Sequence, residues 1–172
     1  KYDGKFELDN FDLGAFLEEK DLGRTSVVLD INGTGFSKKY LNTKLKGNVG
    51  QFKYNGYTYR NIDVNGTMKM PYFKGYINSN DTNLKMDFDG TIDLGKQAKN
   101  FNFKAQIDYA DLYVLNLVKK DSIGIFKGNI NLNAKGNTID DLAGALEIHD
   151  VSYQNSKNYY FFQDFQINSA FD

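Results

Sequence analysis

The sequence contains no cysteine, no tryptophan, one proline and one histidine. Without cysteine the chain has neither a disulfide framework nor a thiolate metal site. Its apolar runs are all far shorter than the roughly 20 residues that a transmembrane helix needs. No signal peptide is recognised, and the chain starts at Lys1, so we expect a fragment of a longer protein with any membrane attachment elsewhere in the parent chain.

An excess of charge of either sign is also missing. The chain carries 21 lysine and arginine residues against 22 aspartate and glutamate residues. The two signs are interspersed, so no strong field favours nucleic acid or an anionic membrane surface. We therefore expect no nucleic-acid partner.

Aromatic residues and strict alternation are abundant instead. The 12 tyrosines and 14 phenylalanines favour β-structure. In residues 82–95, large apolar side chains alternate with charged or polar ones almost without error. Such alternation predicts about ten strands, at residues 2–9, 25–36, 41–54, 57–70, 72–79, 83–94, 101–109, 124–136, 141–153 and 159–171. Short connections make neighbouring strands antiparallel.

A two-residue turn at Asn55-Gly56 fixes the register of one hairpin. The predicted pairs, all on one face, are Val49 with Ile62, Gly47 with Val64, and Leu45 with Gly66. The same register puts four aromatic residues on the other face, unless a bulge at Gly50 rotates them back. These are Phe52, Tyr54, Tyr57 and Tyr59. They form either an aromatic ladder that stabilises the tip or a patch for a partner.

The hairpin recurs 101 residues later, where Leu45 corresponds to Leu146 and Gly66 to Ile167. We therefore expect a single repeat-built segment over residues 1–172, with one repeat at roughly 8–106 and most of a second at roughly 107–172. In each repeat an Asp-Leu pair precedes a stretch, 15–20 or 113–118, that can form one or two helical turns.

Three architectures cover the apolar side of such strands: a sandwich of two sheets, a closed barrel, or one sheet curled into a trough. Alternation alone favours the sandwich. The repeat favours a structure extended along one axis, because a sandwich or a small barrel is finite.

The pattern Gly4-Lys5-Phe6-Glu7-Leu8-Asp9-Asn10-Phe11-Asp12-Leu13-Gly14, followed by Leu22-Gly23 and the turn Asp81-Thr82-Asn83-Leu84, resembles the AsmA-like repeat family. The similarity is greatest to the C-terminal region of TamB proteins of Gram-negative bacteria, and it covers essentially the whole chain. The resemblance implies an all-β fold in which an antiparallel sheet curls into a U-shaped trough, the β-taco, with an apolar interior and one or two short helical crossovers.

The resemblance also implies a function. Such proteins are anchored in the inner membrane, span the periplasm and reach a BamA-like barrel of the outer membrane. They carry phospholipid between the membranes or assist the assembly of outer-membrane proteins. We expect the same localisation and partners for this chain.

The predicted lining of the trough is apolar and suits phospholipid acyl chains. It comprises Leu29, Ile31, Leu45, Val49, Ile62, Val64, Met68, Leu84, Met86, Phe88, Ile92, Leu94, Phe101, Phe103, Ile130, Leu132, Leu146 and Ile148. A dry core is the alternative for the same residues, because alternation does not distinguish a core from a lining. Two rival interpretations are a β-sandwich that docks an outer-membrane barrel or another protein and a strip of outer-membrane barrel.

No catalytic constellation accompanies these strands, so we expect no enzyme, cofactor or metal. His149 is expected on the polar face, in solvent. Residues 87–90 resemble part of a calcium loop, but Lys85 and Lys96 occupy its first and last ligand positions. The sequons at Asn32 and Asn65 match N-glycosylation sites, and Asp121-Ser122-Ile123 is similar to a bacterial O-glycosylation acceptor.

Overall fold

The computed structural model describes residues 1–35, 40–95, 99–119, 122–137 and 143–169. The elements are β1 (Tyr2–Asp12), α1 (Leu13–Leu17), β2 (Leu22–Thr34), β3 (Asn42–Tyr54), β4 (Tyr57–Lys69), β5 (Tyr72–Asn80), β6 (Leu84–Asp93), β7 (Lys99–Asp111), β8 (Gly124–Gly136), β9 (Ala143–Asn155) and β10 (Tyr159–Ser169). Within the described part of the chain, no helix has the length and apolarity to cross a bilayer.

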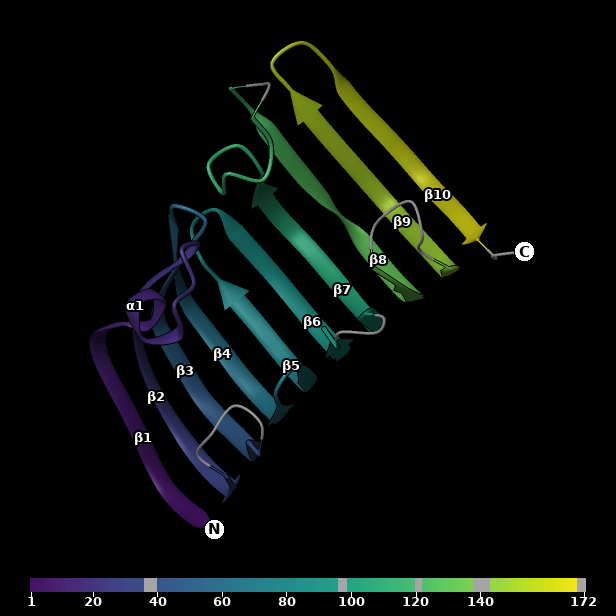
Figure 1. The fold of residues 1–172 in the computed structure, drawn as a ribbon. Coiled ribbons are helices and arrows are strands. Elements are labelled where there is room, and N and C mark those ends of the chain that lie inside the picture. Colours follow the sequence, from purple (N-terminus) through teal and green to yellow (C-terminus); the bar gives the residue numbers. More distant parts are fainter. Residues whose placement is uncertain (36–39, 96–98, 120–121, 138–142, 170–172) are drawn as a thin grey trace.

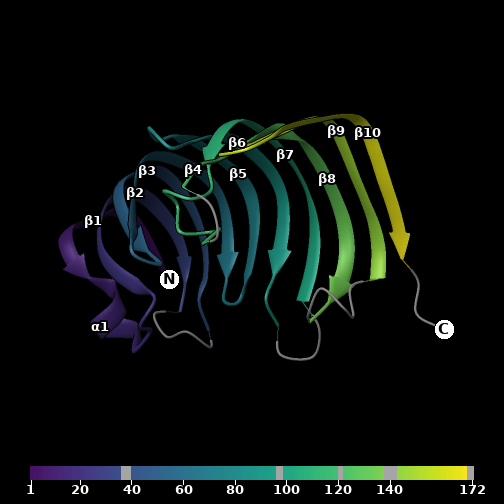
Figure 2. The same cartoon turned by 90° about the horizontal axis from the view of Figure 1, so that it is seen from above.

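All ten strands form one antiparallel sheet whose order follows the sequence from β1 to β10 (Figure 1). β1 and β10 lie at opposite edges of the sheet, so the sheet is open (Figure 1). Seen along the other axis, the strands arch around a hollow (Figure 2). The predicted all-β trough is therefore confirmed. The sandwich and the closed barrel are wrong for this segment, since there is one sheet and its edges do not meet.

The hairpin registers follow the sequence pattern closely. β3 and β4 pair as predicted, with Leu45 opposite Gly66, and β9 and β10 place Leu146 opposite Ile167. Asn55 and Gly56 both have positive φ, 48° and 82°, as a type I′ turn requires. Strand ends differ from the predictions by at most three residues where they are described, and predicted strand residues 36, 141–142 and 170–171 lie outside the described residues.

One of the two predicted crossovers is a helix. In α1 the Asp12 side chain accepts a hydrogen bond of 3.0 Å from the Ala15 amide, and Glu18 ends the helix with φ of 57°. Residues 113–118 form hydrogen-bonded turns instead. The Asp111 side chain caps these turns, because it accepts a hydrogen bond from the Val114 amide at 3.2 Å. The Asp111 carbonyl accepts a hydrogen bond from the Leu115 amide at 2.9 Å, which closes a single α-type turn.

Candidate functional site

The face of the sheet that carries Leu45 and Phe88, here called the inner face, lines the hollow of the trough. Cross-strand pairing aligns its side chains into rows that run from β1 to β10. One row is Phe6, Leu29, Gly47, Val64, Ile77, Phe88, Ala105, Ile130, Ile148 and Phe165. The next is Gly4, Ile31, Leu45, Gly66, Gly75, Gly90, Phe103, Leu132, Leu146 and Ile167. No polar side chain interrupts either row.

The structure places seventeen of the eighteen predicted lining residues on the inner face of the sheet. Ten belong to the two rows above; Met68, Ile92 and Phe101 share a third row, and Val49, Ile62 and Met86 share a fourth. Leu84 lies opposite Ala110 at one end of β6. Leu94 differs from the others because β6 ends at Asp93, so its side chain lies beyond the sheet and is 52% exposed.

Sequence reasoning missed several inner-face residues. Phe73, Ile77 and Ala105 continue the rows, and their alternation in the sequence is a sufficient signal for them. Val151 is buried on the same face as Ile148, three positions away, because the bulge at Asp150 (φ 51°) changes the alternation. The inner-face position of Val151 can therefore be predicted only when the bulge at Asp150 is known.

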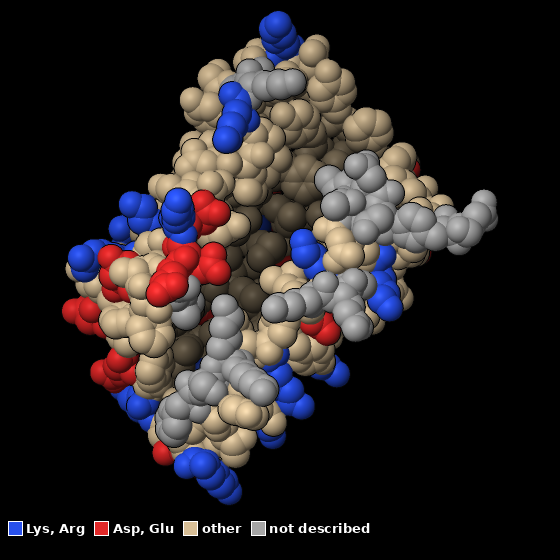
Figure 3. Space-filling view, viewed as in Figure 1, with Lys and Arg blue, Asp and Glu red and all other residues tan. Residues whose placement is uncertain are grey.

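The inner face is half open and does not form a closed core. Among the described residues the large buried apolar side chains are Leu45, Phe88, Leu115 and Val151. The chain exposes 11429 Å² of surface, whereas a compact monomer of 19.6 kDa exposes about 8,600 Å². The excess, about a third, is what an uncovered sheet face produces. Figure 3 shows the hollow with a floor almost free of charge and with lysine, arginine and acidic residues around it.

Three glycines that pair across adjacent strands lie on the floor of the trough, and we call them the glycine crease. Gly66, Gly75 and Gly90 lie directly opposite one another on β4, β5 and β6. A Cβ atom on Gly90, whose φ is 153°, would lie 2.4 Å from the Cα atom of Phe103. Phenylalanine rings gather beside this crease, with centroids 5.1 Å apart for Phe88 and Phe103. The glycines therefore permit close backbone approach, and the rings fill the space above them.

A bulge at Gly50 sets the orientation of the aromatic residues at the tip of the β3–β4 hairpin, as the second of the two predicted alternatives required. The β2–β3 register shifts at Gly50, so Phe52 lies opposite Thr25 and on the same face as Val27. The rings of Phe52 and Tyr54 stack at 6.3 Å, and those of Tyr57 and Tyr59 meet edge to face at 4.8 Å. The contacts run along each strand. Whether the tip binds a partner stays a prediction.

A cluster of polar residues joins the beginning of β4 to the turn between β5 and β6, next to this hairpin tip. The Asp81 side chain is 2% exposed and accepts from the Tyr57 hydroxyl at 2.5 Å, the Arg60 amide at 2.8 Å and the Asn83 amide at 2.8 Å. Asn83 donates its side-chain amide to the Tyr57 oxygen at 3.1 Å. Burial, and then the Asp81 carboxylate, raises the pKa of Tyr57. The cluster ties the β5–β6 turn to β4.

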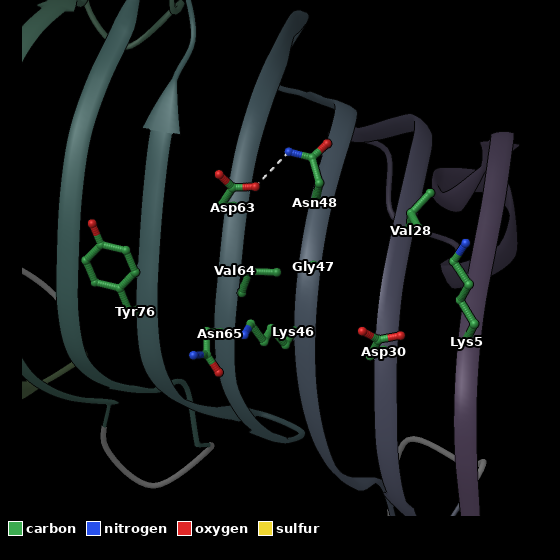
Figure 4. A pocket seen from close by; sticks show the side chains of 10 residues that line it. All are labelled: Lys5, Val28, Asp30, Lys46, Gly47, Asn48, Asp63, Val64, Asn65 and Tyr76. Carbon is green, nitrogen blue, oxygen red and sulfur yellow. Dashed lines mark hydrogen bonds between the residues drawn. The ribbon is translucent and has the colours of Figure 1, made fainter.

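The outer face carries the charged residues and a concavity that crosses β1 to β5. The concavity has a volume of about 400 Å³. The residues that line it are Lys5, Val28, Asp30, Lys46, Gly47, Asn48, Asp63, Val64, Asn65 and Tyr76 (Figure 4). Figure 4 shows Asn48 and Asp63 bonded to each other, at 2.9 Å, and the two lysines on different strands. These groups do not converge on a common point, so the concavity has no recognisable chemistry.

Other polar residues singled out in the sequence also lie outside the trough. His149 is exposed on the outer face and contacts Asp164 at 2.6 Å. Asp87 lies within β6, bonded by Tyr76 and Asn78, while Lys96 and Asp121 lie outside the described residues. Asn32, Asn65 and Ser122 are exposed. Over the described ranges, no three histidine or acidic side chains gather as metal ligands would.

Comparison with known proteins adds no assignment: no family model, curated protein or solved structure matches the chain.

Proposed function

We propose that this chain is a segment of a TamB-like lipid carrier and that its trough binds phospholipid acyl chains. One observation carries the proposal: two uninterrupted apolar rows cross all ten strands on a face that stays half exposed. A monomer gains nothing by leaving such a face open, because exposed apolar area costs about 25 cal/mol per Å². A ligand that covers the face removes that cost.

The dimensions and chemistry of the trough suit an acyl chain. Nine steps of about 4.8 Å between ten strands make it about 43 Å long. Transfer of a chain of about 16 carbons out of water is favourable by on the order of 13 kcal/mol, at about 0.8 kcal/mol per methylene. The rows offer equivalent contacts at each strand, so a chain can slide along them without entering water. Its headgroup stays at the charged margins.

The resemblance to the AsmA-like family supplies the rest of the proposal. The segment works in the periplasm, within an inner-membrane-anchored protein that reaches a BamA-like outer-membrane barrel. A second candidate is a docking role for the hairpin tip, favoured by Tyr54, which is 42% exposed at the end of β3. In that case substitutions at Tyr54 and Tyr57 abolish partner binding and groove substitutions do not.

Native mass spectrometry after gentle purification from a Gram-negative host tests the proposal. We expect bound phospholipid in the unmodified chain, identified after organic extraction. The variant Met86→Asp with Leu132→Asp places two charges on half-buried inner positions and should lose the lipid. Phe88→Asp is a poor choice, because Phe88 packs against Phe73 and Phe103 and is 5% exposed.

The matched control is Thr91→Asp with Asn133→Asp, which adds the same two negative charges on the outer face of the same two strands. Circular dichroism and urea midpoints establish that each variant is folded. Lipid-free wild-type protein, or equal lipid in both variants, would contradict the proposal. Loss of lipid only in the inner-face variant would support it.

A further inference from the structure

Residues 112–118, here called the strap, follow β7 in the connection to β8 and fold back over the trough. Figure 2 shows this segment inside the arch of the sheet. The strap is internally bonded: the Leu112 carbonyl accepts from the Leu117 amide at 2.8 Å and from the Val118 amide at 3.1 Å. The Leu112 amide donates to the Gly124 carbonyl at 2.7 Å, which fixes the strap to β8. It is therefore a compact, internally bonded unit.

Leu115 is the deeply buried residue of the strap. Its side chain is 1% exposed, the lowest value among the large apolar residues described, although the inner face around it is mostly half exposed. Its neighbours in the strap face the other way, with Tyr113 42%, Val114 38% and Leu117 56% exposed. Because the strap lies inside the arch (Figure 2), the buried Leu115 side chain takes space beneath the strap that a bound chain could otherwise use.

Two reciprocal hydrogen bonds hold the strap closed. The Asn55 side chain donates to the Asn116 carbonyl at 3.0 Å, and the Asn116 side chain donates to the Asn55 carbonyl at 2.9 Å. Asn55 lies at the β3–β4 turn, so the strap crosses the ends of β5 and β6, which the sheet order places between β4 and β7. The Asn55 amide also donates to the Asp21 carbonyl at 2.8 Å, which anchors the turn from the other side.

Both asparagines adopt the left-handed conformation, with φ of 48° at Asn55 and 60° at Asn116. Asparagine tolerates this region far better than most residues. Both bonds are solvent-exposed, and a hydrogen bond contributes about 1 kcal/mol net. The closed strap is thus held locally and weakly, compared with the sheet beneath it.

We propose that the strap gates the trough: Leu115 and an acyl chain compete for the stretch over β5 and β6, and the Asn55–Asn116 pair sets how often that stretch is free. This inference rests on the proposed function. The apparent affinity of a site that is open for a fraction of the time falls by that fraction. Locking the strap should weaken binding, and releasing it should strengthen binding.

The variant Asn55→Cys with Asn116→Cys tests the gate. The native chain has no cysteine, so the only disulfide available within the protein is the one that locks the strap, and mass spectrometry monitors its formation. Binding of cis-parinaric acid, a fluorescent fatty acid, is then titrated in the oxidised and reduced states. We expect at least a tenfold higher apparent Kd in the oxidised state, restored on reduction. The single variant Asn116→Cys controls for the oxidant.

A second variant keeps the test decisive if the disulfide forms poorly. Asn116→Ala removes the latch without a cross-link and should bind cis-parinaric acid with a lower apparent Kd than the unmodified chain. Equal affinities in every state and variant would overturn the gate while leaving the lipid-binding function intact. Absence of binding in all of them would overturn both.

Discussion

The hydroxyl of Tyr57 and the carboxylate of Asp81 lie 2.5 Å apart, joining the first residue of β4 to the turn that follows β5. The carboxylate is buried and also accepts from two backbone amides. Asp81 thus joins the turn between β5 and β6 to the beginning of β4.

Replacing Asp81 should destabilise the fold markedly. Asp81→Ala leaves the Tyr57 hydroxyl and the amides of Arg60 and Asn83 without their acceptor, and we expect a loss of about 3 kcal/mol in the free energy of unfolding. Urea denaturation followed by circular dichroism measures it. Asp89→Ala, on the exposed outer face of β6, is the control and should change stability by less than about 0.5 kcal/mol. Equal effects would contradict the role of Asp81.

The glycine crease should not accept a side chain. In Gly90→Ala the new Cβ would lie 2.4 Å from the Phe103 backbone, so β6 and β7 must separate, and we expect a loss of about 2 kcal/mol or more. Gly50→Ala is the matched control, because its Cβ would meet nothing closer than 3.8 Å. Thermal unfolding of both variants checks the difference; a stable Gly90→Ala protein would show that the crease is not tightly packed.

His149 is the one histidine of the sequence, so its imidazole gives a single NMR signal from which its pKa is measured. The hydrogen bond to Asp164 raises the pKa of His149 above 6.5. A raised pKa means that the folded state favours imidazolium, so the stabilisation by this pair is complete below pH 6.5 and disappears as pH rises through the raised pKa. The imidazole resonance in NMR should titrate above 6.5 and shift down in Asp164→Asn. The control Asp150→Asn, which removes a charge beside His149, should lower the pKa of His149 less than Asp164→Asn does.

The two edges of the sheet differ in their protection against further pairing. β1 carries five charged residues, whereas Asp164 is the one charged residue of β10, whose side chains are exposed along its whole length. Unprotected edges promote association. We expect Phe161→Lys, at a 58% exposed outer-face position, to reduce concentration-dependent light scattering without lowering the unfolding midpoint. Unchanged scattering would show that the β10 edge does not drive association.

Alternation and turn chemistry predict the strands and the β3–β4 register, because a hairpin register depends on residues close in sequence. The inner-face position of seventeen of the eighteen predicted lining residues follows from the same alternation, whereas Leu94 lies past the end of β6. Bulges do not, since the left-handed conformations of Asn10, Asn61 and Asp150 depend on how adjacent strands pair. Contacts between distant segments are also invisible in the sequence: nothing near Asn55 indicates Asn116, 61 positions away.

The strand order has a consequence for how the protein is made. Each strand of the sheet pairs only with its neighbours in sequence, so contacts are local and loop closure costs little. A nascent chain can add one strand at a time to the edge that it has just completed, without waiting for residues not yet synthesised. The bonds between Asn55 and Asn116 form only after β7 has joined, so the trough is built open and receives its strap late.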